Sequence, residues 1–95
     1  MDIIKKAREI LQQNKAIVFA YVFGSYVQKK IRKDSDIDLA IYLEDELGTY
    51  EYLELKMLLS EAFNREVDLV ILNKATPLLK YEIYKNNILL FSNDK

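Results

Sequence analysis

The chain has 95 residues, with 14 Lys or Arg, 15 Asp or Glu, and neither histidine nor cysteine. This length predicts one domain over residues 1–95, and the missing residue types exclude disulfides, thiolate metal sites and histidine bases. The near-zero net charge argues against direct nucleic-acid binding, and no apolar run is long enough to span a membrane. Because the first residues do not resemble a signal peptide, we expect a cytoplasmic location.

The hydrophobic pattern predicts helices that alternate with strands. Asp2, Thr49 and Thr76 are candidate helix N-caps, and Pro77 follows the last of them. The expected elements are a helix at residues 3–14, a strand at 17–23, a helical turn at 26–29, a strand at 36–43, a helix at 50–64, a strand at 67–72, a helix at 77–85 and a strand at 88–91. This order predicts an α/β (α+β) fold, a small mixed β-sheet with helices packed on it. The first two strands could pair parallel or antiparallel. The inner side of the helix at 50–64 is expected to carry Leu55, Leu58, Leu59, Ala62 and Phe63.

Asp36 and Asp38 are two residues apart in the strand expected at 36–43. Their side chains would therefore leave the same face, separated by roughly 6.5 to 7 Å of strand rise. Two neighbouring carboxylates raise each other's pKa unless a cation intervenes, and oxygen ligands favour Mg²⁺ or Mn²⁺. The alternative is a solvated strand edge with two surface acids.

Asp68 lies in an apolar run, Val67 to Leu72, where a lone buried carboxylate would be costly without a partner. A metal shared with Asp36 and Asp38 would supply that partner. The alternative is that Asp68 stands near the exposed start of its strand.

Gly24 and Ser25 follow a buried strand and precede the expected helical turn, which Ser25 would cap. Glycine allows a phosphate to approach the backbone closely, and Ser25 offers a hydroxyl and an N–H group. Taken alone, this pair is also what an ordinary strand-to-helix turn contains.

Together these residues resemble the nucleotidyltransferase superfamily that includes DNA polymerase β. The shared pattern is Gly24-Ser25, ten intervening residues, Asp36-x-Asp38 and a later Asp68 in an apolar strand. The small size resembles the minimal nucleotidyltransferase (MNT) group, and residues 67–83 resemble the tail of MNT-type antitoxins. One stretch departs from the family: an Arg-x-Arg-Gly-like run is replaced by Tyr26-Val27-Gln28-Lys29-Lys30.

This resemblance implies site residues and a reaction. Asp36, Asp38 and Asp68 would be catalytic and would bind two Mg²⁺ ions, or Mn²⁺, for an in-line displacement. Gly24 and Ser25 would bind the phosphates of ATP, Lys29 or Lys30 would replace the missing arginine charge, and Tyr26 is a candidate nucleotide contact. The plainer interpretation of Tyr26 is a tyrosine at the edge of the core.

The resemblance also implies a partner. A stand-alone MNT chain is usually paired with a HEPN-domain toxin RNase and is similar to protein adenylyltransferases that place AMP on a tyrosine of the toxin. Two alternatives stay open: an antitoxin or scaffold that acts by binding alone, and the catalytic subunit of a complex that modifies a small molecule. A homo-oligomer is also compatible with the sequence.

Overall fold

The computed structural model describes residues 3–27 and 36–93. In chain order the elements are α1 (Ile3–Gln12), β1 (Ile17–Phe23), the 3₁₀ turn η1 (Gly24–Tyr26), β2 (Ile37–Leu43), α2 (Thr49–Phe63), β3 (Val67–Ile71), the 3₁₀ turn η2 (Leu72–Lys74), α3 (Pro77–Lys85) and β4 (Asn87–Ser92). The predicted alternation of helices and strands is confirmed, and each main element lies within a few residues of its expected range.

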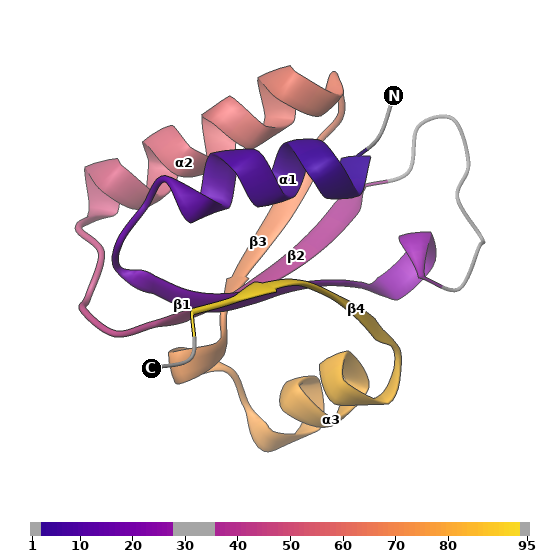
Figure 1. Ribbon diagram of the computed structural model, residues 1–95. Coiled ribbons are helices and arrows are strands. Elements are labelled where there is room, and N and C mark those ends of the chain that lie inside the picture. The colour runs from indigo at the N-terminus through magenta and orange to yellow at the C-terminus, as the bar shows by residue number, and fades with distance from the viewer. Residues whose placement is uncertain (1–2, 28–35, 94–95) are drawn as a thin grey trace.

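The four strands form one mixed sheet in the order β3-β2-β1-β4. Strands β2 and β3 pair in parallel, whereas β1 pairs antiparallel with both β2 and β4. The pairing of the first two strands, which the sequence left open, is therefore antiparallel. Helices α1 and α2 cover one face of the sheet and α3 covers the other (Figure 1).

Each face of the sheet has its own apolar core. The larger cluster fills the space under α1 and α2, with residues such as Leu11, Leu39 and Leu59 fully buried. The smaller cluster lies under α3 and consists of Phe23, Ala40, Leu72 and Ile83. Over the ranges that the structure describes, no helix is long and apolar enough to cross a membrane.

The ends of the helices test the predicted caps. The hydroxyl of Thr76 accepts a hydrogen bond from the Leu79 amide at 3.2 Å, and Pro77 is the first residue of α3, as expected.

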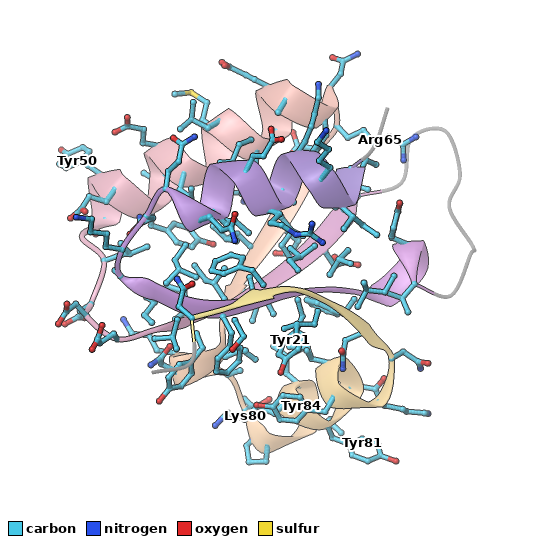
Figure 2. All side chains as sticks on the ribbon, in the orientation of Figure 1. Tyr21, Tyr50, Arg65, Lys80, Tyr81 and Tyr84 are labelled. Atoms are coloured by element: carbon cyan, nitrogen blue, oxygen red, sulfur yellow. The ribbon has the colours of Figure 1, made fainter. Side chains whose placement is uncertain are left out.

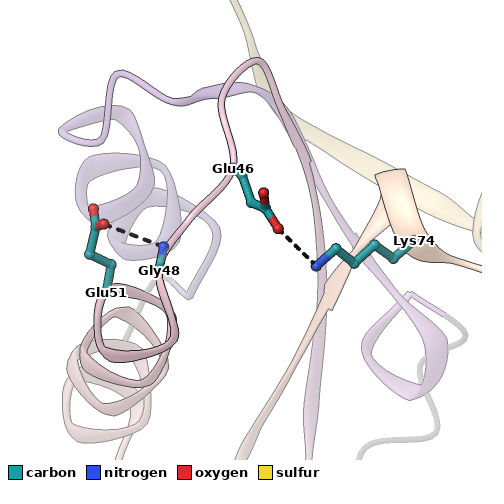
Figure 3. A network of polar contacts seen from close by, with 4 residues as sticks. All are labelled: Glu46, Gly48, Glu51 and Lys74. Carbon is teal, nitrogen blue, oxygen red and sulfur yellow. Dashed lines mark hydrogen bonds and ion pairs between the residues drawn. The ribbon is translucent and has the colours of Figure 1, made fainter.

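Thr49 is not the cap of α2: it is the first helical residue, and Gly48 is the N-cap. The Glu51 carboxylate accepts a hydrogen bond from the Gly48 amide at 3.3 Å, and close by Lys74 and Glu46 form an ion pair at 3.5 Å (Figure 3). The predicted cap Asp2 lies outside the described residues.

Two further local predictions are wrong. Leu58 is 48% exposed, because α2 buries a single stripe of residues four apart, Leu55, Leu59 and Phe63, and Leu58 lies beside that stripe. Ser25 does not cap a following turn, since η1 starts one residue earlier and Ser25 is its middle residue.

Candidate active site

Three strands bring the predicted site residues to one end of the sheet. Phe23, the last residue of β1, is the register partner of Asp38 in β2. Asp38 is in turn the register partner of Asp68 in β3. Gly24 directly follows Phe23, so the glycine turn and the two aspartates lie in one row across three neighbouring strands.

Asp38 and Asp68 share the face of the sheet that α3 covers. Their neighbours in sequence, Ile37, Leu39 and Leu69 among them, belong to the larger core under α1 and α2. Because side chains alternate along a strand, the two carboxylates leave the opposite face. The predicted separation of Asp38 from the apolar side of its strand is thus observed in the structure.

Gly24 lies in direct contact with Asp38. Its φ of 72° falls in the left-handed region that glycine adopts readily. A β-carbon built at this position would overlap the carboxylate oxygen Oδ2 of Asp38 and would lie 3.1 Å from its Cγ. The turn therefore depends on glycine both for its conformation and for the space that Asp38 occupies.

Asp68 is exposed near the start of its strand, so of the two environments that the sequence left open the structure shows the exposed one and not the buried one. It is the second residue of β3, and β3 is an edge strand that pairs with β2 alone among the described strands. Because the Asp68 carboxylate is exposed to solvent, it does not need a cation or a hydrogen-bond donor to offset a cost of burial. The case for Asp68 as a site residue depends on its register with Asp38.

The carboxylate oxygens of Asp38 and Asp68 are of the type that binds Mg²⁺ or Mn²⁺, although the described side chains do not form a complete set of metal ligands. Adjacent strands lie about 4.8 Å apart, so carboxylates in register on one face can share an ion. Asp36 is exposed and precedes the first residue of β2. Within residues 3–27 and 36–93, no three Asp, Glu, His or Cys side chains form a group that could hold a metal. The residues thus fit a metal by type and by strand position, and Asp36 would have to join Asp38 and Asp68.

The structure gives less support to the other predicted nucleotide contacts, Tyr26 and Lys29 or Lys30. Tyr26 is half-buried and packs against the larger core cluster, which gives its ring a structural role. Its contact with a nucleotide stays a prediction. Lys29 and Lys30 lie outside the described residues.

Arg65 is a cation near this end of the sheet that the sequence did not single out. It lies three residues before Asp68, and the carbonyl of the next residue, Glu66, accepts a hydrogen bond from the Ile37 amide at 3.0 Å. The Nη1 atom of Arg65 is buried without a hydrogen-bond partner. Figure 2 shows Arg65 where α2 ends and β3 begins. The hydrogen bond between Glu66 and Ile37 joins segments far apart in the sequence, and it brings Arg65 near the start of β2, where Asp38 lies. A local sequence pattern does not predict this position.

The sheet has helices on both faces and carries two aspartates in register beside a glycine turn. This arrangement places the chain in the class of small nucleotidyltransferase domains. The family model described as polymerase beta nucleotidyltransferase matches residues 5–95. The chain belongs to that family, which confirms the resemblance found in the sequence.

Comparison with known proteins points to one group within the family. The chain is 36% identical over 81 residues to the protein adenylyltransferase MntA of Shewanella oneidensis, a match that covers 85% of this chain and 56% of that protein. The chain thus spans just over half the length of that relative.

Two solved structures support the same grouping. A toxin–antitoxin structure with AMP-PNP superposes with a TM-score of 0.86 at 31% identity and covers 94% of this chain and 73% of the other. A structure of a tri-AMPylated HEPN toxin of Shewanella oneidensis in complex with an MNT antitoxin has a TM-score of 0.78 at 27% identity, with 95% and 70% covered.

Proposed function

We propose that this chain is a metal-dependent protein adenylyltransferase, an antitoxin that moves AMP from ATP to a tyrosine hydroxyl of a HEPN-domain toxin and thereby inactivates it. The observation that carries the proposal is the row across three strands: Asp38 lies in register with Asp68 and its carboxylate lies against Gly24. The relative named a protein adenylyltransferase and the complex with an AMPylated HEPN toxin support the choice of acceptor.

The proposed chemistry is a displacement at the α-phosphorus of ATP. The tyrosine oxygen forms a bond to phosphorus, its proton leaves, and the bond to pyrophosphate breaks. Asp36, Asp38 and Asp68 would hold two Mg²⁺ ions, whose contribution is to lower the pKa of the hydroxyl and to neutralise phosphate charge. Gly24 and Ser25 would lie along the phosphates, and Lys29 would add positive charge. With ATP as donor, we place the reaction in the cytoplasm.

The strand order supports placing the two halves of the substrate on two sides of Asp38. The glycine turn extends from β1 and Asp68 lies on β3, so Asp38 stands between them. The departing pyrophosphate would therefore lie on the β1 side, and the acceptor hydroxyl on the β3 side. Positioning and charge neutralisation account for most of the rate in such a reaction, which needs no histidine.

The test is transfer of label from ATP labelled at the α-phosphate, with Mg²⁺ and a HEPN-domain toxin encoded beside the gene for this chain. Wild type is compared with Asp38→Asn and Asp68→Asn. Asp45→Asn serves as the matched control, because Asp45 is an exposed aspartate that follows β2 at its other end. We expect label on the toxin with wild type and the control, and a loss of at least about a hundredfold in the two site variants.

Other outcomes would contradict the proposal in different ways. Label from the γ-phosphate in place of the α-phosphate would indicate a kinase. A tight complex that neutralises the toxin without any label would leave an antitoxin that acts by binding. Label on a small molecule alone would favour the catalytic subunit of another transferase.

A further inference from the structure

Two groups of exposed apolar side chains lie on opposite layers of the molecule. The α3 surface consists of Leu78, Tyr81, Tyr84 and Leu89, which are 72%, 61%, 53% and 49% exposed. The α2 surface consists of Tyr50, Leu53, Met57 and Leu58, which are 87%, 52%, 57% and 48% exposed. Because α2 and α3 cover opposite faces of the sheet (Figure 1), a partner that contacts one surface need not contact the other.

The α3 surface shares its face of the sheet with the proposed active site. Leu89 is the register partner of Tyr21, whose side chain lies on the α3 side of β1. The rings of Tyr21 and Tyr84 meet edge to face, with centroids 6.2 Å apart (Figure 2). Tyr21 is two residues from Phe23, the register partner of Asp38. Tyr84 of the α3 surface thus packs against a β1 residue on the same face of the sheet as Phe23, two positions from the strand end that carries the site.

Strand addition is disfavoured at both edges of the sheet. On β3, the Tyr52 hydroxyl donates a hydrogen bond to the Leu69 carbonyl. On β4, the Arg8 Nε donates one to the Leu90 carbonyl at 2.8 Å. A side chain therefore already occupies one carbonyl on each edge strand, which makes these edges poorer templates for an added strand than free ones.

A protein acceptor needs more surface than the site itself offers. Its tyrosine must reach the face of the sheet where Asp38 and Asp68 lie, whereas a specific complex buries about 800 Å² on each partner. An acceptor that approaches from this face would then extend its contact from the site over α3. The α3 surface is apolar and rich in tyrosine, the residue type enriched where binding energy is concentrated.

We infer that the α3 surface is the docking surface for the acceptor protein, an inference that rests on the proposed function. The acceptor would cover Leu78, Tyr81, Tyr84 and Leu89 while its tyrosine enters the site from the α3 side. The α2 surface would stay outside this interface.

Two matched double variants test the inference. Leu78→Glu with Tyr81→Glu changes the α3 surface, and Leu53→Glu with Met57→Glu changes the α2 surface at residues of similar exposure. All four residues are exposed on helices, so we expect both variants to fold, which circular dichroism checks. Affinity for the HEPN-domain toxin is measured by calorimetry, label transfer is measured as above, and AMP-PNP binding is measured separately.

We expect the α3 variant to lose about thirtyfold or more in toxin affinity and to lose label transfer in parallel, with AMP-PNP binding unchanged. The α2 variant should stay within about twofold of wild type. Equal effects of the two variants, or a larger effect of the α2 variant, would overturn the inference. So would a loss of self-association in the α3 variant without the toxin, since a second copy would then be the occupant.

The affinity measurement separates this inference from the proposed function. If wild type binds the toxin but transfers no label, the adenylyltransferase proposal fails, and the comparison of the two variants still decides which surface docks the toxin. If label is transferred and the α3 variant binds normally, only the docking surface is wrong.

Discussion

The carboxylate of Asp38 occupies the space that a β-carbon at Gly24 would need, so the turn after β1 and the aspartate of β2 are packed directly together. Asp38 is also the register partner of Asp68. The proposed phosphate-binding turn and the proposed metal ligands are therefore held in one arrangement by the sheet.

Replacing Gly24 with alanine is expected to abolish most of the transferase activity. The new methyl group would displace the Asp38 carboxylate, and the left-handed φ of 72° costs an alanine about 1–2 kcal/mol. We expect activity to fall by at least about a hundredfold, measured by label transfer, with a moderate loss of stability in urea.

Gly48→Ala is the matched control for that change. Gly48 caps α2 with a φ of −67°, which alanine adopts freely, and only the Glu51 carboxylate lies near the new methyl group, at 3.2 Å. The control should lose no more than about 1 kcal/mol of stability and should keep its activity. Equal activity in the two variants would show that the contact between Gly24 and Asp38 is dispensable.

Mg²⁺ together with AMP-PNP is expected to stabilise the folded chain. A ligand present at about a hundred times its Kd adds about 2.7 kcal/mol to the free energy of unfolding. Thermal denaturation should show this gain for wild type and for Asp45→Asn, but not for Asp38→Asn. A full gain in Asp38→Asn would argue against Asp38 as a metal ligand, whatever the activity of that variant.

Tyr21 is expected to make stability depend on pH in the alkaline range. Burial raises the pKa of the Tyr21 hydroxyl above its ordinary value, and the neighbouring Tyr84 raises that pKa further. The unfolded chain then releases this proton first, so the contribution is complete below about pH 10 and is lost as the pH rises from there through the folded-state pKa. Urea unfolding on both sides of about pH 10 measures the effect.

Tyr21→Phe should show a weaker decline of stability in that range. Tyr50→Phe, at a tyrosine that is 87% exposed, should decline as wild type does. The interpretation would be wrong if Tyr21→Phe and wild type lost stability in parallel.

Asn73 is expected to matter for stability but not for chemistry. Its amide accepts a hydrogen bond from the Leu43 N–H and donates one to the Leu43 carbonyl, each at 2.9 Å, at the end of β2 far from Asp38. Asn73→Ala should reduce the free energy of unfolding by about 1–3 kcal/mol, because both Leu43 groups lose their partner. Label transfer well below the melting temperature should remain normal, and a selective loss of activity would contradict this assignment.

The sequence by itself determined the elements and the candidate residues. Apolar periodicity predicted the bounds of the described α-helices and strands to within a few residues. Thr76-Pro77 marked the start of α3. The spacing of Gly24, Asp36, Asp38 and Asp68 indicated the family, which the comparisons confirm. These features are local, since propensity, capping and side-chain alternation depend on neighbours along the chain.

Only the tertiary structure decided how distant residues meet. Strand pairing put Asp38 between Phe23 and Asp68, exposed Asp68 on an edge strand, and placed the apolar α3 surface on the same face as the site. The exposure of Leu58 and the position of Arg65 likewise depend on which layer each helix covers and on which strand pairs with which. The physical reason is that register and layer order result from side-chain packing between segments far apart in sequence, which no local pattern specifies.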